Sequence, residues 1–261
     1  MEQERKKEGI IKKLFISFFM CLSMFTRIPP LIKKWDEEAK DYMIIMLPLV
    51  GAIIGGLWYG IYAILSSTPL PKEIIALGMA LFPFLITGFM HFDGFLDVID
   101  ASKSYRSKEE KIKILKDPHV GSFAVSYGII VILATYVTFS CLNVDYLILI
   151  FIPIASRILS GLFLCFFDKI RTSEYAKEEN RKFKTFKIIY FIVFLLGILV
   201  LAYFAVGLVS LSLIVLILMN LYCHLRSYLN FGGINGDVSG YALTVSELVS
   251  LISLIVIGVF L

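Results

Sequence analysis

The chain has 261 residues, of which 58% are hydrophobic and 18% are charged, and its mean hydropathy is +0.84. These values exclude an ordinary soluble domain and indicate a helical protein that crosses a membrane several times. The net charge of +4 is small. Because no basic stripe interleaved with aromatic side chains occurs on a soluble domain, nucleic acid is not expected as a partner.

The chain begins with a charged segment, residues 1–13, which is followed by an apolar run at residues 14–25. A run of this length is too short to span a bilayer, since a spanning helix needs about 20 residues. Lysines flank the run on both sides, and the positive-inside rule places both flanks in the cytoplasm. We therefore expect an interfacial or re-entrant helix that ends before Pro29 and Pro30.

Seven long apolar segments follow, and each is predicted to form a transmembrane helix. The loops after the second and fourth segments are rich in lysine and arginine, whereas those after the first, third and fifth are short and nearly free of them. This alternation places the basic loops in the cytoplasm. It predicts one all-α, polytopic domain over residues 1–261 in the cell membrane. The segments are residues 42–65, 74–90, 123–139, 146–167, 188–206, 208–229 and 243–261.

A short cytoplasmic amphipathic helix is predicted at residues 107–116, inside the first basic loop. Ser107 is followed three residues later by Glu110, which is the spacing of a capping box. Ile112 and Leu115 would face the membrane or the core, while the lysines remain in water.

Residues 89–121 carry the strongest chemical signal of the chain. At about 100° per residue, Asp93, Asp97 and Asp100 fall within roughly 60° of one another on one helix face. Such carboxylates repel one another, and Mg²⁺ would remove the repulsion, with phosphate oxygens and water completing its coordination. The pattern predicts a phosphate-handling metal site at the cytoplasmic face, although aspartates can also simply cap a helix end. His91 lies opposite Asp97, which favours a supporting role or a contact with a leaving group.

The segment that follows the amphipathic helix is a candidate phosphate contact. Lys116 precedes a Pro-His turn, after which Gly121 and Ser122 open the next apolar segment with free backbone donors. Free N–H groups at a helix start suit a phosphate, but a simple turn is equally compatible with these residues.

A late glycine-rich loop, residues 231–240, lies on the same predicted side of the membrane. Gly232 and Gly233 permit unusual or tightly packed backbone, and they are further candidate phosphate contacts. The loop lacks the GK[ST] ending of a P-loop, so a flexible turn is the alternative. It brings Asp237 to the cytoplasmic face, where this carboxylate could complete a metal site from a second helix.

Three charged residues lie within the predicted spans. A buried guanidinium must face a polar cavity or an acidic partner, and its fork fits a phosphate, so Arg157 is expected to contact substrate or to brace the site. Glu247 is an intramembrane acid and therefore a functional candidate, with a helix-packing hydrogen bond as the alternative. Arg226 lies near the end of its span and could extend to the surface without binding a ligand.

Taken together and in this order, the motifs resemble those of the cobalamin synthase family, also called adenosylcobinamide-GDP ribazoletransferases. The His-x-Asp-Gly-x-x-Asp-x-x-Asp block with the later Gly-Asp-x-x-Gly loop is the specific part. The chain departs from the family pattern at residues 101–106, where a glycine-rich piece is common, and at Asn235, where threonine is common. The matching pieces are TRIPP (26–30), PLVG (48–51), HFDGFLDVID (91–100), KDPHVGSF (116–123), the pair Ser156 and Arg157, and GGINGDVSG (232–240).

The resemblance implies that adenosylcobinamide-GDP presents its pyrophosphate to Mg²⁺. The 5′ oxygen of α-ribazole, or of its 5′-phosphate, would attack the phosphorus on the cobinamide side, and GMP would leave. Asp237 would be a fourth metal ligand or the base, and it is slightly preferred to Asp100 as the base. A homo-oligomer is compatible with the sequence. In this scheme the metal ligands are Asp93, Asp97 and Asp100, and the candidate phosphate contacts are Arg27, Lys116 and Arg157.

Two other functions fit parts of the sequence. A transporter would explain charges inside the membrane, but the acids gather at one membrane face rather than at the midplane. A CDP-alcohol phosphotransferase has a related Asp-Gly motif, but Phe95 and Leu96 stand here where that family has Ala-Arg. Release of GMP rather than CMP would separate the two enzymes.

Overall fold

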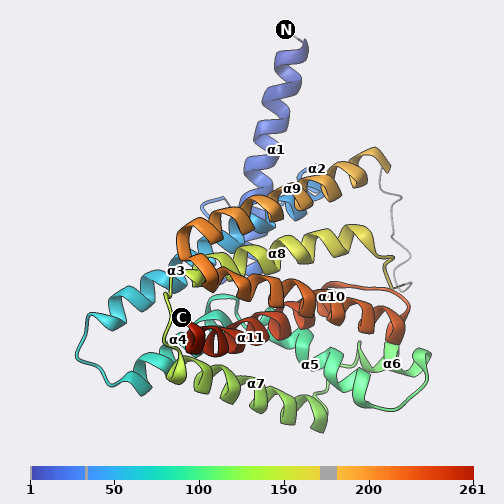
Figure 1. The fold of residues 1–261 in the computed structure, drawn as a ribbon. Coiled ribbons are helices and arrows are strands. Elements are labelled where there is room, and N and C mark those ends of the chain that lie inside the picture. Colours follow the sequence, from blue (N-terminus) through green and yellow to red (C-terminus); the bar gives the residue numbers. More distant parts are fainter. Residues whose placement is uncertain (1, 33–34, 171–180) are drawn as a thin grey trace.

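The computed structural model describes residues 2–32, 35–170 and 181–261. Within these ranges the chain is helical, without a β-strand, and one isolated backbone bridge joins Lys169 to Ile234. The N-terminal helix projects from a bundle formed by the other helices (Figure 1). The elements are α1 (Glu2–Phe25), α2 (Glu37–Met43), η1 (Ile44–Met46), α3 (Leu47–Ser66), α4 (Lys72–Ile86), α5 (Met90–Lys103), α6 (Lys108–Ile114), α7 (Ser122–Cys141), α8 (Ile148–Phe166), α9 (Arg181–Val206), η2 (Gly207–Ser210), α10 (Leu211–Phe231) and α11 (Gly236–Phe260).

Five helical stretches of the described chain are long and apolar enough to cross a membrane, or six if the bent pair α4 and α5 forms one span. One stretch, Arg181–Phe231, contains 51 residues. At 1.5 Å per residue it is more than twice as long as the bilayer core of about 30 Å. Its helices α9 and α10 are joined by η2, which begins at Gly207 with a φ of +58°, and the chain turns back there (Figure 1). The predicted all-α polytopic class is confirmed, while the number of seven crossings stays a prediction.

The second predicted span, residues 74–90, is wrong at its C-terminal end. α4 ends at Ile86, because Gly88 and Phe89 both have positive φ values, 60° and 63°, that no α-helix accommodates. α5 consequently leaves α4 at an angle of 86°. Arg27 lies at this bend: its backbone N–H donates to the carbonyl oxygen of Ile86 at 2.7 Å, and its guanidinium lies over the Cα of Gly88.

The N-terminal helix is longer than the predicted segment 14–25, because the charged residues before it are also helical. Its C-terminal half packs into the bundle. Ile16 and Met20 form a buried cluster with Ala39 and Met43 of α2. The hydroxyl of Ser17 donates to the carbonyl oxygen of Ala39 at 2.5 Å. α1 is therefore anchored through its last turns, which also place the segment that bears Arg27.

α8 lies at the centre of the bundle and packs against α3, α9, α10 and α11. α3 approaches it at Gly51 and Gly55, where a Cβ atom would meet the carbonyl oxygens of Pro153 and Ile150. Such close backbone contact requires residues without a side chain. Arg157, in the middle of α8, is consequently surrounded by protein and is 3% exposed.

The amphipathic helix predicted at residues 107–116 is present as α6, and its capping box is formed. The Ser107 hydroxyl accepts from the backbone N–H of Glu110 at 3.3 Å, and the Glu110 carboxylate accepts from the backbone N–H of Ser107 at 3.1 Å. These hydrogen bonds lower the pKa of Glu110. α6 lies beside the ends of α5 and α10 (Figure 1), where Lys111 donates to the side chain of Asn230 at 3.2 Å.

Candidate active site

The predicted acidic helix is present as α5, and it carries Asp93, Asp97 and Asp100 along its length. Asp93 is exposed, and the other two are partly buried. The negative charges of Asp93, Asp237 and Asp100 all act on the carboxylate of Asp97. The structure therefore brings an acid from α11 to the acids of α5. We call these four aspartates the acidic end of the bundle.

α5 and α11 pack closely in the first turn of α11, which contains Asp237. A Cβ on Gly94 would lie 2.8 Å from the Cα of Asp237, so the backbone of α11 fills the space beside this glycine. The backbone of Gly94 is therefore not open to a ligand or a metal ion on this side. Gly94 instead allows two helices to touch.

Asn235, which the sequence showed as a departure from the family pattern, holds the start of α11. Its side-chain oxygen accepts from the backbone N–H of Val238 at 3.0 Å, and its side-chain nitrogen donates to the Asp237 carboxylate at 2.7 Å. Asparagine is a favoured N-cap residue, so an Asn just before an apolar helix was the available signal. Asn235 therefore holds one oxygen of the Asp237 carboxylate in place.

Asp100 and Gly121, which we predicted in separate roles, meet at the start of α7. The carboxylate of Asp100 lies directly over the Cα of Gly121, the residue that precedes Ser122, the first residue of the helix. Both line a shallow pocket of about 290 Å³. The negative charge of Asp100 would repel a phosphate bound at the same helix start. A phosphate could therefore bind here only with a cation between it and Asp100.

The Lys116 loop stands in water beside that pocket. Asp117 accepts from the backbone N–H of His119 at 3.0 Å, and the two side chains approach to 2.6 Å. These hydrogen bonds lower the pKa of Asp117. Lys116 is exposed, as a phosphate contact at the site entrance would require.

The glycine-rich loop has less room for a phosphate than we predicted. Gly232, with φ +71°, ends α10, and the ammonium group of Lys108 lies over it. Gly233 is buried, and a Cβ there would lie 2.5 Å from the backbone nitrogen of Ile170. The N–H of Ile234 is already used, since it donates to the carbonyl oxygen of Asp168 at 2.9 Å. We therefore leave Gly233 out of the site proposed below.

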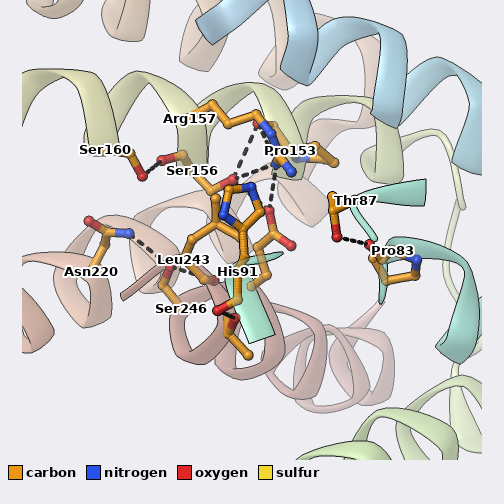
Figure 2. Close-up of polar contacts among 12 residues, drawn as sticks. Pro83, Thr87, His91, Pro153, Ser156, Arg157, Ser160, Asn220, Leu243 and Ser246 are labelled. Atoms are coloured by element: carbon orange, nitrogen blue, oxygen red, sulfur yellow. Dashed lines mark hydrogen bonds and ion pairs between the residues drawn. The ribbon is translucent and has the colours of Figure 1, made fainter. Parts of the chain in front are cut away.

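Arg157 and Glu247, which were singled out separately, are partners. The guanidinium donates to the Glu247 carboxylate at 3.1 Å, and the side chains are 3% and 11% exposed. The same guanidinium nitrogen also donates to the carbonyl oxygen of Pro153 at 3.2 Å, and the hydroxyl of Ser156 donates to Glu247 at 2.5 Å. Figure 2 shows these contacts between α8 and α11. The geometry matches a bracing role for Arg157 and the helix-packing alternative for Glu247.

His91 points into the protein rather than toward the acidic end. Its ring lines a cavity of about 40 Å³ together with Arg157 and Glu247, and the ring of Phe25 stacks on it with the ring centroids 5.9 Å apart. Its Nε2 atom is buried and has no hydrogen-bond partner among the described residues. We call Ser156, Arg157, Glu247 and His91 the buried junction. Arg226 is exposed, as the surface alternative predicts.

The acidic end offers carboxylate oxygens, the ligand type that a hard cation prefers, although its four acids do not all point to one place. In the described part of the chain, no group of three or more His, Cys, Asp or Glu side chains is arranged to hold a metal ion. Mg²⁺ does not need such a cage, since it is usually held by one or two carboxylates together with substrate phosphates and water. Carboxylates from α5 and α11 fit that coordination.

The fold and these residues define a polytopic helical membrane protein whose carboxylates from two helices gather at one end of the bundle. The family model for cobalamin-5-phosphate synthase matches residues 17–255. This chain therefore belongs to the cobalamin-5-phosphate synthase family, as the sequence motifs indicated.

Similar proteins cover nearly the whole chain. A protein from Clostridium perfringens is 38% identical over 253 residues, which are 94% of this chain and 99% of that protein. A protein from Clostridium botulinum is 35% identical, with 93% and 98% covered, and one from Lachnoclostridium phytofermentans is 32% identical, with 92% and 93% covered. All three are named adenosylcobinamide-GDP ribazoletransferase. No solved structure gives a significant match to the chain.

Proposed function

We propose that this protein is an adenosylcobinamide-GDP ribazoletransferase, which joins the two halves of vitamin B12 in a late step of its synthesis. The observation that carries this proposal is the family match over residues 17–255, which includes both the acidic helix and the late glycine-rich loop. The contact between Gly94 and Asp237 supports it, because it brings these two motifs, far apart in the sequence, to one place.

In the proposed reaction, a free ribose hydroxyl oxygen of α-ribazole, or of its 5′-phosphate, attacks the phosphorus on the cobinamide side of the pyrophosphate. The expected 5′ oxygen cannot be the nucleophile for both substrates, because in the 5′-phosphate it already carries a phosphate. The new P–O bond forms as the bond to the bridging oxygen breaks, and GMP leaves with that oxygen. The hydroxyl proton passes to a protein base. The products are adenosylcobalamin, or its 5′-phosphate, and GMP.

Asp97 of α5 and Asp237 of α11 are the proposed metal ligands, with Asp93 and Asp100 as further candidates; Asp100 lies over Gly121. A bound Mg²⁺ would neutralise the pyrophosphate and stabilise the charge that develops as GMP leaves. The donation from Asn235 at 2.7 Å holds the Asp237 carboxylate in one orientation, which suits either a ligand or the proton acceptor. We favour Asp237 over Asp100 as the base, because Asp100 lies against the start of α7.

The candidate phosphate contacts differ in how well their positions suit the role. Lys116 and Arg27 are exposed, and Arg27 lies over the bend from which α5 begins, so both could reach a substrate. Arg157 is paired with Glu247, and we assign it to bracing. The basic loop that contains Lys103 and Lys113 belongs to the same end of the bundle, which supports a cytoplasmic location for the site in a cell membrane.

The proposal is tested with the purified full-length protein in detergent, supplied with adenosylcobinamide-GDP and α-ribazole. We expect Mg²⁺-dependent release of GMP, which EDTA abolishes, and no release of CMP from a CDP-alcohol. Asp97→Asn removes a charge at constant shape, and we expect it to reduce the rate by about 10²-fold or more. Full activity of folded Asp97→Asn would overturn the assignment of the metal site. Movement of substrate across vesicles without turnover would support a transporter instead.

A further inference from the structure

We propose that Gly94 and Gly240 are positioning residues, which set the distance between α5 and α11 and thereby hold Asp237 beside the acids of α5. This inference rests on the proposed function, in which acids from both helices share a metal. It adds two residues that touch neither the metal nor the substrate.

The first contact is at Gly94. A Cβ atom on this residue would lie 2.8 Å from the Cα and 2.9 Å from the carbonyl oxygen of Asp237, whereas ordinary contact begins at 3.4 Å. Both neighbouring atoms belong to the backbone, so no change of rotamer can relieve the overlap. The first turn of α11 itself would have to move.

The second contact lies at Gly240, with the roles of the two helices exchanged. A Cβ atom here would lie 3.0 Å from the carbonyl oxygen and 3.2 Å from the Cα of His91. The hydroxyl of Thr244 donates to the same carbonyl oxygen at 3.3 Å. Because His91 precedes Gly94 while Gly240 follows Asp237, the two helices run antiparallel. Their spacing is therefore fixed at two contacts, one at each glycine.

α5 cannot retreat easily from α11, because its other side is packed. The ring of Phe92 packs edge to face against Phe84 of α4, with the ring centroids 5.0 Å apart. Phe92 and Phe95 belong to a buried cluster with Val131 of α7. Extra volume at Gly94 is therefore expected to displace the start of α11, where Asp237 lies one residue after the helix begins.

Such a displacement would act directly on the acidic end. The charge of Asp93 on α5 acts on Asp237 across the interface of the two helices. Mg²⁺ requires oxygen ligands at about 2.0–2.1 Å in near-octahedral geometry, which tolerates little movement of a ligand. An added methyl group at Gly94 should weaken metal binding without removing any carboxylate.

The test compares Gly94→Ala and Gly240→Ala with Gly56→Ala as a matched control. Gly56 is also helical but exposed, and a Cβ atom there meets nothing within 4 Å. Each change replaces a helical glycine by alanine, so all three raise the intrinsic helix propensity by the same amount. Binding of Mn²⁺ to the purified full chain without substrate is measured by electron paramagnetic resonance, and thermal unfolding checks the fold. Asp97→Asn reports on the metal site itself.

We expect Gly94→Ala to raise the Kd for Mn²⁺ by about tenfold or more, since an ångström of misplacement can cost about a hundredfold at a site. Gly240→Ala should have a smaller effect of the same sign, and Gly56→Ala should leave the Kd unchanged. If Gly94→Ala does not fold, the result for Gly240→Ala decides.

The failures of the two proposals are distinguishable. If Asp97→Asn weakens Mn²⁺ binding but both glycine variants bind as the wild type does, the positioning role is overturned and the metal site stands. If Asp97→Asn leaves the Kd unchanged, the metal site itself is overturned.

Discussion

The acidic end and the buried junction both place charged side chains on apolar helices, but they balance that charge differently. In the junction, the guanidinium of Arg157 finds the carboxylate of Glu247 at 3.1 Å, and the hydroxyl of Ser156 adds a further donor. At the acidic end, Asp93, Asp97, Asp100 and Asp237 lie near one another, and among the described residues the structure gives none of these four an ion pair with Lys or Arg.

This difference separates charges that balance each other within the fold from charges that the proposed function assigns to a bound cation. A buried pair that is internally balanced needs nothing from outside, and removing one partner exposes the cost of burying the other. A group of like charges is a net cost to the fold, which a bound cation would remove. The same substitution of an acid should therefore have opposite effects on stability in the two regions.

The largest effect is expected at the junction. Glu247→Leu leaves the Arg157 charge buried without a partner, which should lower the free energy of unfolding by about 3–5 kcal/mol. The double variant Arg157→Met with Glu247→Leu replaces the pair by apolar side chains and should recover most of that loss. Unfolding of each purified variant in mixed micelles measures both. If the single and double variants were equally stable, the unpaired Arg157 charge would not be the cause of the loss, and the account of the ion pair would be wrong.

The second effect has the opposite sign. Asp97→Asn removes one of several like charges, so the free energy of unfolding should stay the same or rise, while GMP release falls. The same unfolding measurement checks this, with Glu247→Gln as the matched acid-to-amide change at the junction. Clear destabilisation by Asp97→Asn would place Asp97 with the structural charges.

The smallest effect is expected within the acidic end, where the substitution of Asp100 should differ in sign from that of Asp97. Asp100 lies over Gly121 at the start of α7, where a negative charge interacts favourably with the helix dipole. Asp100→Asn should therefore lower the free energy of unfolding by about 0.3–1 kcal/mol, unlike Asp97→Asn. A rise in stability after Asp100→Asn would instead group Asp100 with the acids that repel one another.

Local sequence signals predicted the parts of this fold that depend on local chemistry. Long apolar runs predicted helices because an isolated membrane span must satisfy its own backbone hydrogen bonds. The capping box at Ser107 predicted α6 for a similar reason, since both of its partners lie within one turn. The bend after α4 was missed, because Phe89 is apolar and nothing in its side chain indicates its positive φ of 63°.

Contacts between distant segments were beyond prediction from spacing. Arg157 and Glu247 were both identified as buried charges, but 90 residues separate them and no periodicity joins them. Nothing in the sequence around Gly94 shows that the backbone of α11 approaches it. The charge pattern of the loops placed Asp237 on the same membrane face as the acidic helix, whereas the direct contact of α5 with α11 depends on packing that the sequence does not show.

The central claim, that α5 and α11 supply one cation site, is tested most directly by a double-mutant cycle on Mn²⁺ affinity. Asp97→Asn and Asp237→Asn are measured singly and together, with the purified protein and no substrate. We predict that each single change raises the Kd by about tenfold or more and that the double variant falls well short of the product of the two effects, because both remove ligands of the same ion. Two fully additive effects, or no effect of Asp237→Asn, would contradict a shared site.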